Sequence, residues 1–130
     1  MIICCRCGAS HANSRKHRYC NSCQTEAVSK WKAAHPEGWK AIQVKARRKR
    51  RIRQQEIRNA AKDRPCADCG VKYPFYVMDF DHKPDTVKEF NIASGLGGKS
   101  FKKFYAEIAK CDVVCANCHR ERTYSRGLSH

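Results

Sequence analysis

A small α+β fold built around bound metal ions is predicted by three observations. Eight of the ten cysteines form four Cys-x-x-Cys pairs, a spacing typical of zinc sites. A strongly basic segment separates the first two pairs from the last two. The residues between the last two pairs alternate like strands and then follow a helical pattern. We therefore expect a zinc ribbon over residues 1–28, a basic helical linker over 29–64 and an α+β domain over 65–130.

The length and the cysteine content limit the class of protein. A chain of 130 residues has room for one ordinary domain or two very small ones, and very small domains usually need metals or disulfides. Met1 is followed by no apolar run of signal-peptide or membrane-spanning length, so we expect a cytoplasmic protein with no membrane partner. Thiols in that compartment stay reduced, which favours metal ligands over disulfides.

The N-terminal part has the spacing of a zinc ribbon, in which two Cys-x-x-Cys turns hold one tetrahedral ion. Twelve residues separate its two pairs, and Gly8 suits the tight turn that follows the first pair. The polar and basic stretch 13–18 is expected to form a loop over phosphate. A ribbon that contacts DNA directly and a ribbon that only supports the neighbouring segment are equally compatible with this sequence. The predicted ligands are Cys4, Cys7, Cys20 and Cys23.

The middle segment carries most of the net charge of +15, with thirteen basic residues and three acids in 30–64. A helical pattern begins at Ser29, pauses at 35–38 and resumes to about Lys62, before Pro65 ends it. Its apolar stripe is too thin to hold a core, so we expect a largely exposed helix. Such a block of like charge favours nucleic acid as the partner over a merely solvated face. The residues expected to contact nucleic acid here are Lys45, Arg47, Arg48, Lys49, Arg50, Arg51 and Arg53.

The C-terminal part predicts two strands followed by a helix. The segments 75–81 and 87–92 alternate in the manner of strands. Ser100 is a suitable N-cap for a helix that continues to about Lys110. A short last helix is expected to start near Cys118. The predicted buried face of the first helix consists of Phe101, Phe104, Tyr105 and Ile108.

Two Cys-x-x-Cys pairs 45 residues apart predict a second zinc ion in this part. Four thiolates close the coordination shell, so this ion is expected to be structural and to contribute on the order of 10 kcal/mol. Cys5 and Cys111 are then left over: Cys5 is an alternative ligand for the ribbon, and Cys111 is expected to be a buried small hydrophobe. The predicted ligands of the second ion are Cys66, Cys69, Cys115 and Cys118.

Residues outside the zinc ligands have a pattern suited to phosphodiester hydrolysis. Asp81 and His82 are adjacent, so in a strand their side chains point to opposite faces. Hydrolysis needs a base, a role that suits histidine, and a cation to neutralise the charge developing on the phosphate. A carboxylate with one further ligand, here His119, can hold such an ion. Asp79 is either a partner of this group or only a polar residue at a strand edge.

These residues resemble a known family. The run Met78-Asp-Phe-Asp-His82, followed by Val113-Val-Cys-Ala-Asn-Cys-His-Arg120, is similar to HNH endonucleases of the zinc-knuckle type found in phages and mobile elements. The resemblance covers about 66–126 and implies a ββα-metal fold that cleaves DNA. It implies that His82 is the general base and that Asp81 and His119 hold a catalytic Mg²⁺ or Mn²⁺. Lys110 stands where the family has an asparagine that helps to orient the histidine.

The expected function is therefore a metal-dependent DNA endonuclease that nicks or cuts double-stranded DNA. Its expected cofactors are two structural zinc ions and one catalytic divalent cation, and its location is the host cytoplasm if a phage encodes it. Arg120 and Arg122 are either phosphate contacts or solvated residues of the last helix. The alternative function is a non-catalytic zinc-containing protein that binds DNA or RNA. Cleavage of RNA is a third and weaker alternative, since the phosphate chemistry is shared.

Overall fold

The computed structural model describes residues 1–12 and 18–127, and it divides the chain into two compact units. Unit 1 is Met1–Arg47 and unit 2 is Arg48–His130. The described residues form four α-helices and two small antiparallel sheets, which is a small α+β structure. The three-part division at residues 28 and 64 stays a prediction. The polar stretch expected to lie over phosphate falls largely outside the described residues.

Unit 1 is built from a two-stranded sheet, the whole of one helix and the first part of a second. Strand β1 (Ile2–Ile3) pairs antiparallel with β2 (Ser10–His11). Helix α1 (Asn21–Ala34) begins directly after Cys20, which is its N-cap. The predicted helix start at Ser29 was therefore too late, because the second cysteine pair lies at the first turn of a helix.

Helix α2 (Pro36–Lys62) follows α1 after the single residue His35, so the predicted pause at 35–38 is shorter than expected. The backbone N–H of His35 donates to the carbonyl of Trp31 at 2.9 Å, and the two rings stack at 5.1 Å between centroids. Pro36 begins the new helix because the first turn needs no N–H donor from it. None of the helices in the part of the chain that the structure describes is long and apolar enough to cross a bilayer.

Unit 2 contains a second two-stranded sheet with helices beside it. Strand β3 (Met78–His82) pairs antiparallel with β4 (Cys111–Cys115), and Met78 lies opposite Cys115. A single 3₁₀ turn, η1 (Phe75–Val77), precedes β3 where the strand was predicted to begin. The predicted strand at 87–92 was wrong, since these residues form turns and bends. The partner of β3 is β4, which the sequence pattern did not reveal.

The two helices predicted in unit 2 are present. Helix α3 (Phe101–Ala109) is capped by Ser100, whose Oγ accepts a hydrogen bond from the backbone N–H of Lys103 at 3.3 Å. Helix α4 (Ala116–Ser125) is capped by Cys115, slightly earlier than expected. The predicted buried face of α3 needs one correction. Tyr105 is 51 % exposed, whereas Glu107 is 1 % exposed.

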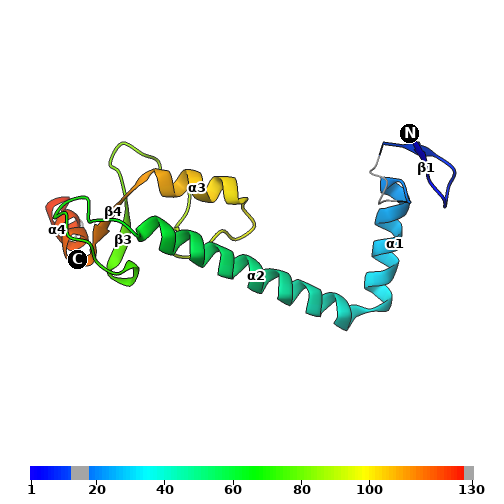
Figure 1. Ribbon diagram of the computed structural model, residues 1–130, viewed down its shortest axis with the longest axis horizontal. Helices are drawn as coiled ribbons and strands as arrows, with labels where there is room; N and C mark the ends of the chain where they lie inside the picture. Colours follow the sequence, from blue (N-terminus) through cyan, green and yellow to red (C-terminus); the bar gives the residue numbers. More distant parts are fainter. Residues whose placement is uncertain (13–17, 128–130) are drawn as a thin grey trace. The chain divides into compact units, whose positions relative to one another are not determined.

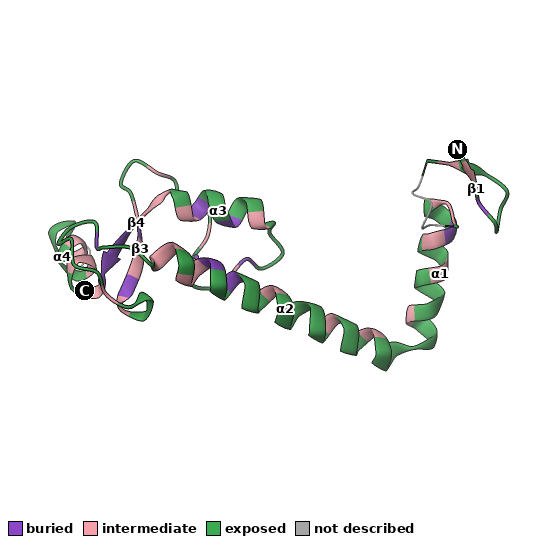
Figure 2. Cartoon of the chain, in the orientation of Figure 1, coloured by how far each residue is buried: buried purple, intermediate pink, exposed green. Residues whose placement is uncertain are grey.

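The core of unit 2 consists of two clusters, visible as the purple segments of Figure 2. One cluster surrounds the sheet and includes Met78 and Val114 beside two cysteines. The other joins Ile57 of α2 to Ile92, Leu96 and Phe104. The last turns of α2 therefore run beside α3 (Figure 1) and belong to the core, although the sequence predicted a largely exposed helix without a core face. The apolar stripe is short, and the remainder of α2 is mostly exposed.

Candidate metal centres and candidate catalytic cleft

The four cysteines expected to bind the second zinc ion converge in unit 2. The Sγ atoms of the group all lie within 4.8 Å of one another. Tetrahedral zinc with bonds of about 2.3 Å places its thiolates about 3.8 Å apart, so this donor set fits one ion. The first pair lies in a tight turn closed by Gly70 (φ 72°), and the second pair lies at the start of α4. The ligands are Cys66, Cys69, Cys115 and Cys118.

Backbone donors prepare one of these thiols for a metal. Burial acts to raise the pKa of Cys66, but the N–H groups of Cys69, Cys115 and Asp68 lower that pKa to about 6. The bond from the Cys115 N–H measures 3.2 Å. Zinc binds thiolate rather than thiol, so a thiol that ionises near neutral pH is a favourable ligand.

The other four-cysteine group, in unit 1, has the same construction. Its Sγ atoms also lie within 4.8 Å of one another, and those of Cys7 and Cys20 are 3.7 Å apart. Gly8 has a φ of 73°, the left-handed conformation expected for the turn after the first pair. Both groups can therefore hold one metal ion each, as predicted. The ligands in unit 1 are Cys4, Cys7, Cys20 and Cys23.

An open cleft of about 730 Å³ lies in unit 2 beside the edge of β3. All three residues with predicted catalytic roles, Asp81, His82 and His119, line it. The cleft is also lined by the end of α2, the η1 turn, the segment 88–93 and Arg126. None of the four-cysteine groups takes part in its lining. The cysteine groups and the candidate catalytic residues therefore occupy separate places in unit 2.

His82 is held by a buried carboxylate that the sequence pattern did not identify. Its Nε2 lies 2.8 Å from Oε1 of Glu107 on α3, and the His82 side chain is 18 % exposed. Within the described residues, Nδ1 of His82 has no hydrogen-bond partner. An ionised carboxylate only accepts, so Nε2 carries the proton and donates it to Glu107. This leaves the lone pair of Nδ1 available, and fixes the ring by its other nitrogen.

The Glu107 carboxylate is ionised because four donors surround it. Burial acts to raise its pKa, but hydrogen bonds from Lys110, His82 and the N–H groups of Glu89 and Phe90 lower the pKa to about 2. Lys110 Nζ donates to Glu107 Oε2 at 2.9 Å and to Glu89 Oε1 at 2.8 Å. Lys110 therefore positions Glu107, which in turn positions His82. The two carboxylates in turn raise the pKa of Lys110, with Glu89 the larger cause.

Asp81 is buried and accepts from two arginines of α4 and its end. Arg126 donates to both carboxylate oxygens at 2.9 and 3.0 Å, and Arg122 Nη1 donates to Oδ2 at 2.8 Å. Burial acts to raise the pKa of Asp81, but these arginines lower it. The carboxylate is thus charged, and both of its oxygens are occupied by guanidinium groups.

His119 stands between two carboxylates of β3. Its Nδ1 is 3.1 Å from Asp79 Oδ2, and its Nε2 is 3.8 Å from Asp81 Oδ1. Adjacent ligands of a Mg²⁺-sized octahedral ion are about 3 Å apart and opposite ligands about 4 Å, so this pair spans a feasible separation. Asp79 can fix the ring with Nε2 directed at the ion, the usual support of a metal-binding histidine. In this structure Arg126 and Arg122 occupy both oxygens of Asp81, and the two four-cysteine groups are the metal-binding groups found among the described residues.

Two of the predicted nucleic-acid contacts are engaged inside unit 2. The Arg50 guanidinium donates to the backbone carbonyl of Lys99 and lies over the Phe101 ring at 5.3 Å. Arg122 donates to Asp68 at 2.6 and 2.7 Å, to Asp81 and to Asp112, and the carboxylate of Asp68 is the largest cause of its raised pKa. Arg122 therefore links the first cysteine turn, both strands and α4.

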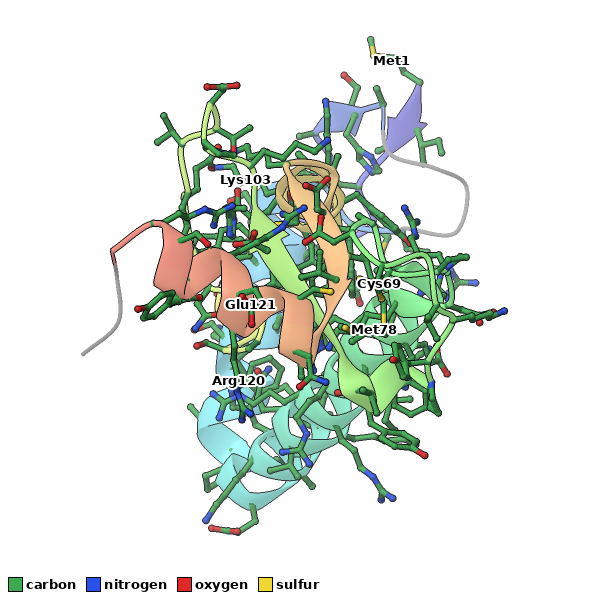
Figure 3. The ribbon with its side chains drawn as sticks, turned by 90° about the vertical axis from the view of Figure 1, so that its left-hand side faces the viewer. Met1, Cys69, Met78, Lys103, Arg120 and Glu121 are labelled. Atoms are coloured by element: carbon green, nitrogen blue, oxygen red, sulfur yellow. The ribbon has the colours of Figure 1, made fainter. Side chains whose placement is uncertain are left out.

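The other predicted contacts are exposed. Arg120 extends from α4 (Figure 3) without an ion pair among the described side chains. The exposed residues of α2 in the same group are Lys45, Arg47, Arg48, Lys49, Arg51 and Arg53. Arg53 has one partner, Glu56, at 3.8 Å.

The two leftover cysteines differ in environment. Cys5 is exposed and outside the four-cysteine group of unit 1. Cys111 is half-buried against the cluster around Phe104, and burial raises the pKa of its thiol to about 11. Neither cysteine joins a metal group among the described residues.

Comparison with known proteins adds no family assignment. No protein-family model, no curated protein and no solved structure matches the chain. The case for function therefore rests on the residues and on their geometry.

Proposed function

We propose that the protein is a metal-dependent DNA endonuclease of the HNH type. One observation carries the proposal: a single open cleft brings together a histidine fixed by a buried carboxylate and a second histidine beside two aspartates. The first histidine is His82, and the second is His119. The four-cysteine groups are closed sites and offer no open position for a substrate.

His82 is the proposed general base. Glu107 accepts the Nε2 proton and keeps the ring in one tautomer, so Nδ1 can take a proton from a water that attacks phosphorus. A divalent cation held by Asp81 and His119 would neutralise the charge growing on the phosphate oxygens. Arg126 is then released from Asp81 at the mouth of the same cleft, where its guanidinium can contact the phosphate.

The exposed cations of α2 are the proposed source of affinity for double-stranded DNA. A helix with Lys45, Arg47 and Arg48 in succession presents charge suited to a phosphate backbone, which is contacted without sequence preference. Residues 65–130 carry ten basic and eight acidic side chains, so this part of unit 2 is close to neutral and offers little long-range attraction. We therefore assign binding to α2 and cleavage to the cleft.

The test is nicking of supercoiled plasmid by the zinc-loaded protein, with Mg²⁺ or Mn²⁺ added or withheld. Chelators are avoided because they would also remove zinc. We expect metal-dependent nicking, and a loss of about 10²- to 10⁴-fold in rate for His82→Ala. Asp85→Ala is the matched control, since Asp85 is exposed three residues further along the chain. Zinc content and thermal melting show whether each variant is folded.

A non-catalytic zinc-containing DNA- or RNA-binding protein is the second candidate, and the arginines on Asp81 favour it. In that case the Asp81–Arg122–Arg126 network is structural, and the only role of His82 is to donate a hydrogen bond to the buried carboxylate of Glu107. The plasmid assay separates the two candidates. Plasmid bound by the protein but never nicked with Mg²⁺ or Mn²⁺, or nicked equally by His82→Ala, would exclude the endonuclease.

A further inference from the structure

The rim of the cleft carries an exposed aromatic pair that the proposed hydrolysis does not use. Phe75 and Tyr76 form the η1 turn immediately before β3, and both line the cleft. Their rings meet edge to face at 5.6 Å between centroids with an interplanar angle of 82°. Tyr76 is nevertheless 76 % exposed, so it contributes little to the core. The contact with Phe75 orients the ring without covering it.

Single exposed aromatic residues are common and need no function. Tyr105 and Tyr124 are also exposed in unit 2, but neither lines the cleft. The position of Tyr76 differs because the same cleft contains His82, His119 and Asp81. An aromatic face beside a candidate phosphate site is the arrangement that a nucleotide requires, with a surface for its base and charge for its phosphate.

The polar lining of the cleft also suits a nucleobase. Asn59 accepts from Gln55 Nε2 at 2.7 Å, and Asn91 accepts from the N–H of Ala93 at 3.0 Å, in both cases through Oδ1. The Nδ2 donors of these two asparagines have no hydrogen-bond partner among the described residues. Amide groups of this kind recognise the edges of bases.

The charge of the cleft fits a phosphate group. Four cations, Arg58, Lys62, Lys88 and Arg126, line it against the carboxylates of Asp79 and Asp81. Lys88 is exposed and forms no ion pair among the described residues. A volume of about 730 Å³ is within the range of about 300–1,000 Å³ that holds small ligands.

We infer that the cleft takes an unpaired nucleotide of the DNA strand, with its base stacked on Tyr76. This rests on the proposed endonuclease function and names its substrate more closely: DNA with a base outside the duplex stack at the cut position. In a continuous duplex the faces of each base are covered by its neighbours, so an aromatic ring can reach a base face only where stacking is interrupted. The amides of Asn59 and Asn91 then meet the exposed base edge.

The experiment measures binding of fluorescein-labelled oligonucleotides to the zinc-loaded protein without Mg²⁺ or Mn²⁺, so that no cleavage occurs. The probes are single-stranded DNA, the perfect duplex of the same sequence and the RNA of the same sequence. Stacking of one base on one ring predicts that Tyr76→Leu weakens binding of single-stranded DNA by roughly 5- to 100-fold. Tyr76→Phe keeps the aromatic face and should bind within about twofold of wild type.

Tyr124→Leu is the matched control, because Tyr124 is 73 % exposed in the same unit but lies outside the cleft. A single-stranded probe that contains 2-aminopurine adds a signature of stacking. Its fluorescence should be quenched by wild type and by Tyr76→Phe, and should recover with Tyr76→Leu. The duplex should bind all four proteins alike.

Several outcomes would overturn the inference. One is an equal loss of single-strand binding in Tyr76→Leu and Tyr124→Leu. Another is a loss of binding in Tyr76→Leu that is the same for duplex and single-stranded DNA. A third is the absence of 2-aminopurine quenching by wild type. Tighter binding of RNA than of DNA would overturn DNA as the occupant. Plasmid nicking that depends on His82 together with unchanged binding by Tyr76→Leu leaves the endonuclease and removes only the stacking site. Tyr76-dependent binding without any cleavage removes the endonuclease and leaves the nucleotide site.

Discussion

The two four-cysteine centres begin and end in the same way, yet among the described residues the candidate cleft lies in the unit of only one of them. Each opens with a turn in which the glycine N–H donates to the first cysteine carbonyl, at 2.9 Å for Gly8 and 3.0 Å for Gly70. Each closes with a cysteine at the N-cap of a helix, Cys20 before α1 and Cys115 before α4. The metal-binding frame is therefore nearly the same structure used twice.

The difference lies in what the frame encloses. Between its two pairs, unit 1 has twelve residues, and its only buried side chains among those described are Cys4 and Cys23. Unit 2 has 45 residues in the same place, enough for β3, α3 and β4 and for two apolar clusters. Both cysteine groups can hold a metal ion, but only in unit 2 does the inserted segment carry candidate catalytic residues, Asp81 and His82, with His119 directly after the last cysteine.

The largest expected effect is loss of a metal, and it should differ between the units. Cys4→Ser with Cys7→Ser should unfold residues 1–34, because a structural zinc ion contributes on the order of 10 kcal/mol and unit 1 has almost no other core. Unit 2 should stay folded. Amide hydrogen exchange should show lost protection in α1 alone, and bound zinc should fall from two ions per chain to one.

The reciprocal variant sharpens the comparison. Cys66→Ser with Cys69→Ser should remove protection from β3, β4 and α4 and abolish the proposed nicking. Part of the cluster around Phe104 should persist, because it does not contain the cysteine ligands. Retention of two zinc ions by either variant, or full protection of the unit that lost its ligands, would contradict the common frame.

The second expected effect concerns Glu107, which has no counterpart in unit 1. Its pKa is about 2 in the folded protein against an ordinary value of 4.5, so its charge stabilises the fold above pH 4.5 and this contribution is lost as the pH falls towards 2. Wild type should exceed Glu107→Gln in unfolding free energy by about 3 kcal/mol at neutral pH. The difference should shrink steadily between pH 5 and pH 2. Denaturant unfolding at several pH values measures it.

The side chains that face Glu107 are His82 from β3 and Lys110 at the end of α3, with Glu89 on the far side of the lysine. Glu121→Gln is the matched control, since Glu121 extends from the exposed side of α4 (Figure 3). Acid loss of zinc affects all three proteins and cancels in the differences. A constant gap between wild type and Glu107→Gln across this pH range would show that Glu107 is not held as a charged group.

Local signals in the sequence were sufficient for part of the fold. The cysteine spacing, the glycine turns and the Ser100 cap depend on residues close in the chain, and the structure has all of them. The strand predicted at 87–92 is absent. The alternation of apolar and polar residues there arises because Phe90 and Ile92 pack on the core from a backbone of turns and bends. Strand β4 is only five residues long and lies between a helix and a cysteine pair. It is too short to show the alternation of apolar and polar residues that marks a strand.

The support of the candidate site could not be predicted for a different reason. Glu107 lies one helical turn from Phe104, on the face that packs inward, but glutamate is almost never fully buried unless it is paired. Its burial depends on Lys110 and on His82, which is 25 residues away in the sequence. The pairing of Asp81 with Arg122 and Arg126 likewise spans more than forty residues. Interactions of this kind leave no local pattern.

The smallest expected effect is on the salt dependence of DNA binding. It tests whether DNA is bound by the basic helix α2 in particular or by positive charge anywhere on the protein. Arg47→Gln with Arg48→Gln removes two exposed cations of α2, and the slope of log K against log salt for duplex DNA should fall by about 2. Lys102→Gln with Lys103→Gln removes the same charge from the exposed side of α3 and should leave the slope nearly unchanged. Equal changes in both double variants would contradict a specific role for α2.

Arg50 provides the internal comparison within the helix, because its guanidinium is bound to the Lys99 carbonyl and lies over Phe101. Arg50→Gln should lower the melting temperature while the salt slope changes by much less than about 1. A slope that falls by about 1 with unchanged melting would show that Arg50 leaves these contacts to bind phosphate. In the expected outcome, neighbouring arginines have two different roles. Arg47 and Arg48 face solvent, whereas Arg50 attaches the helix to the rest of unit 2, which contains the cleft.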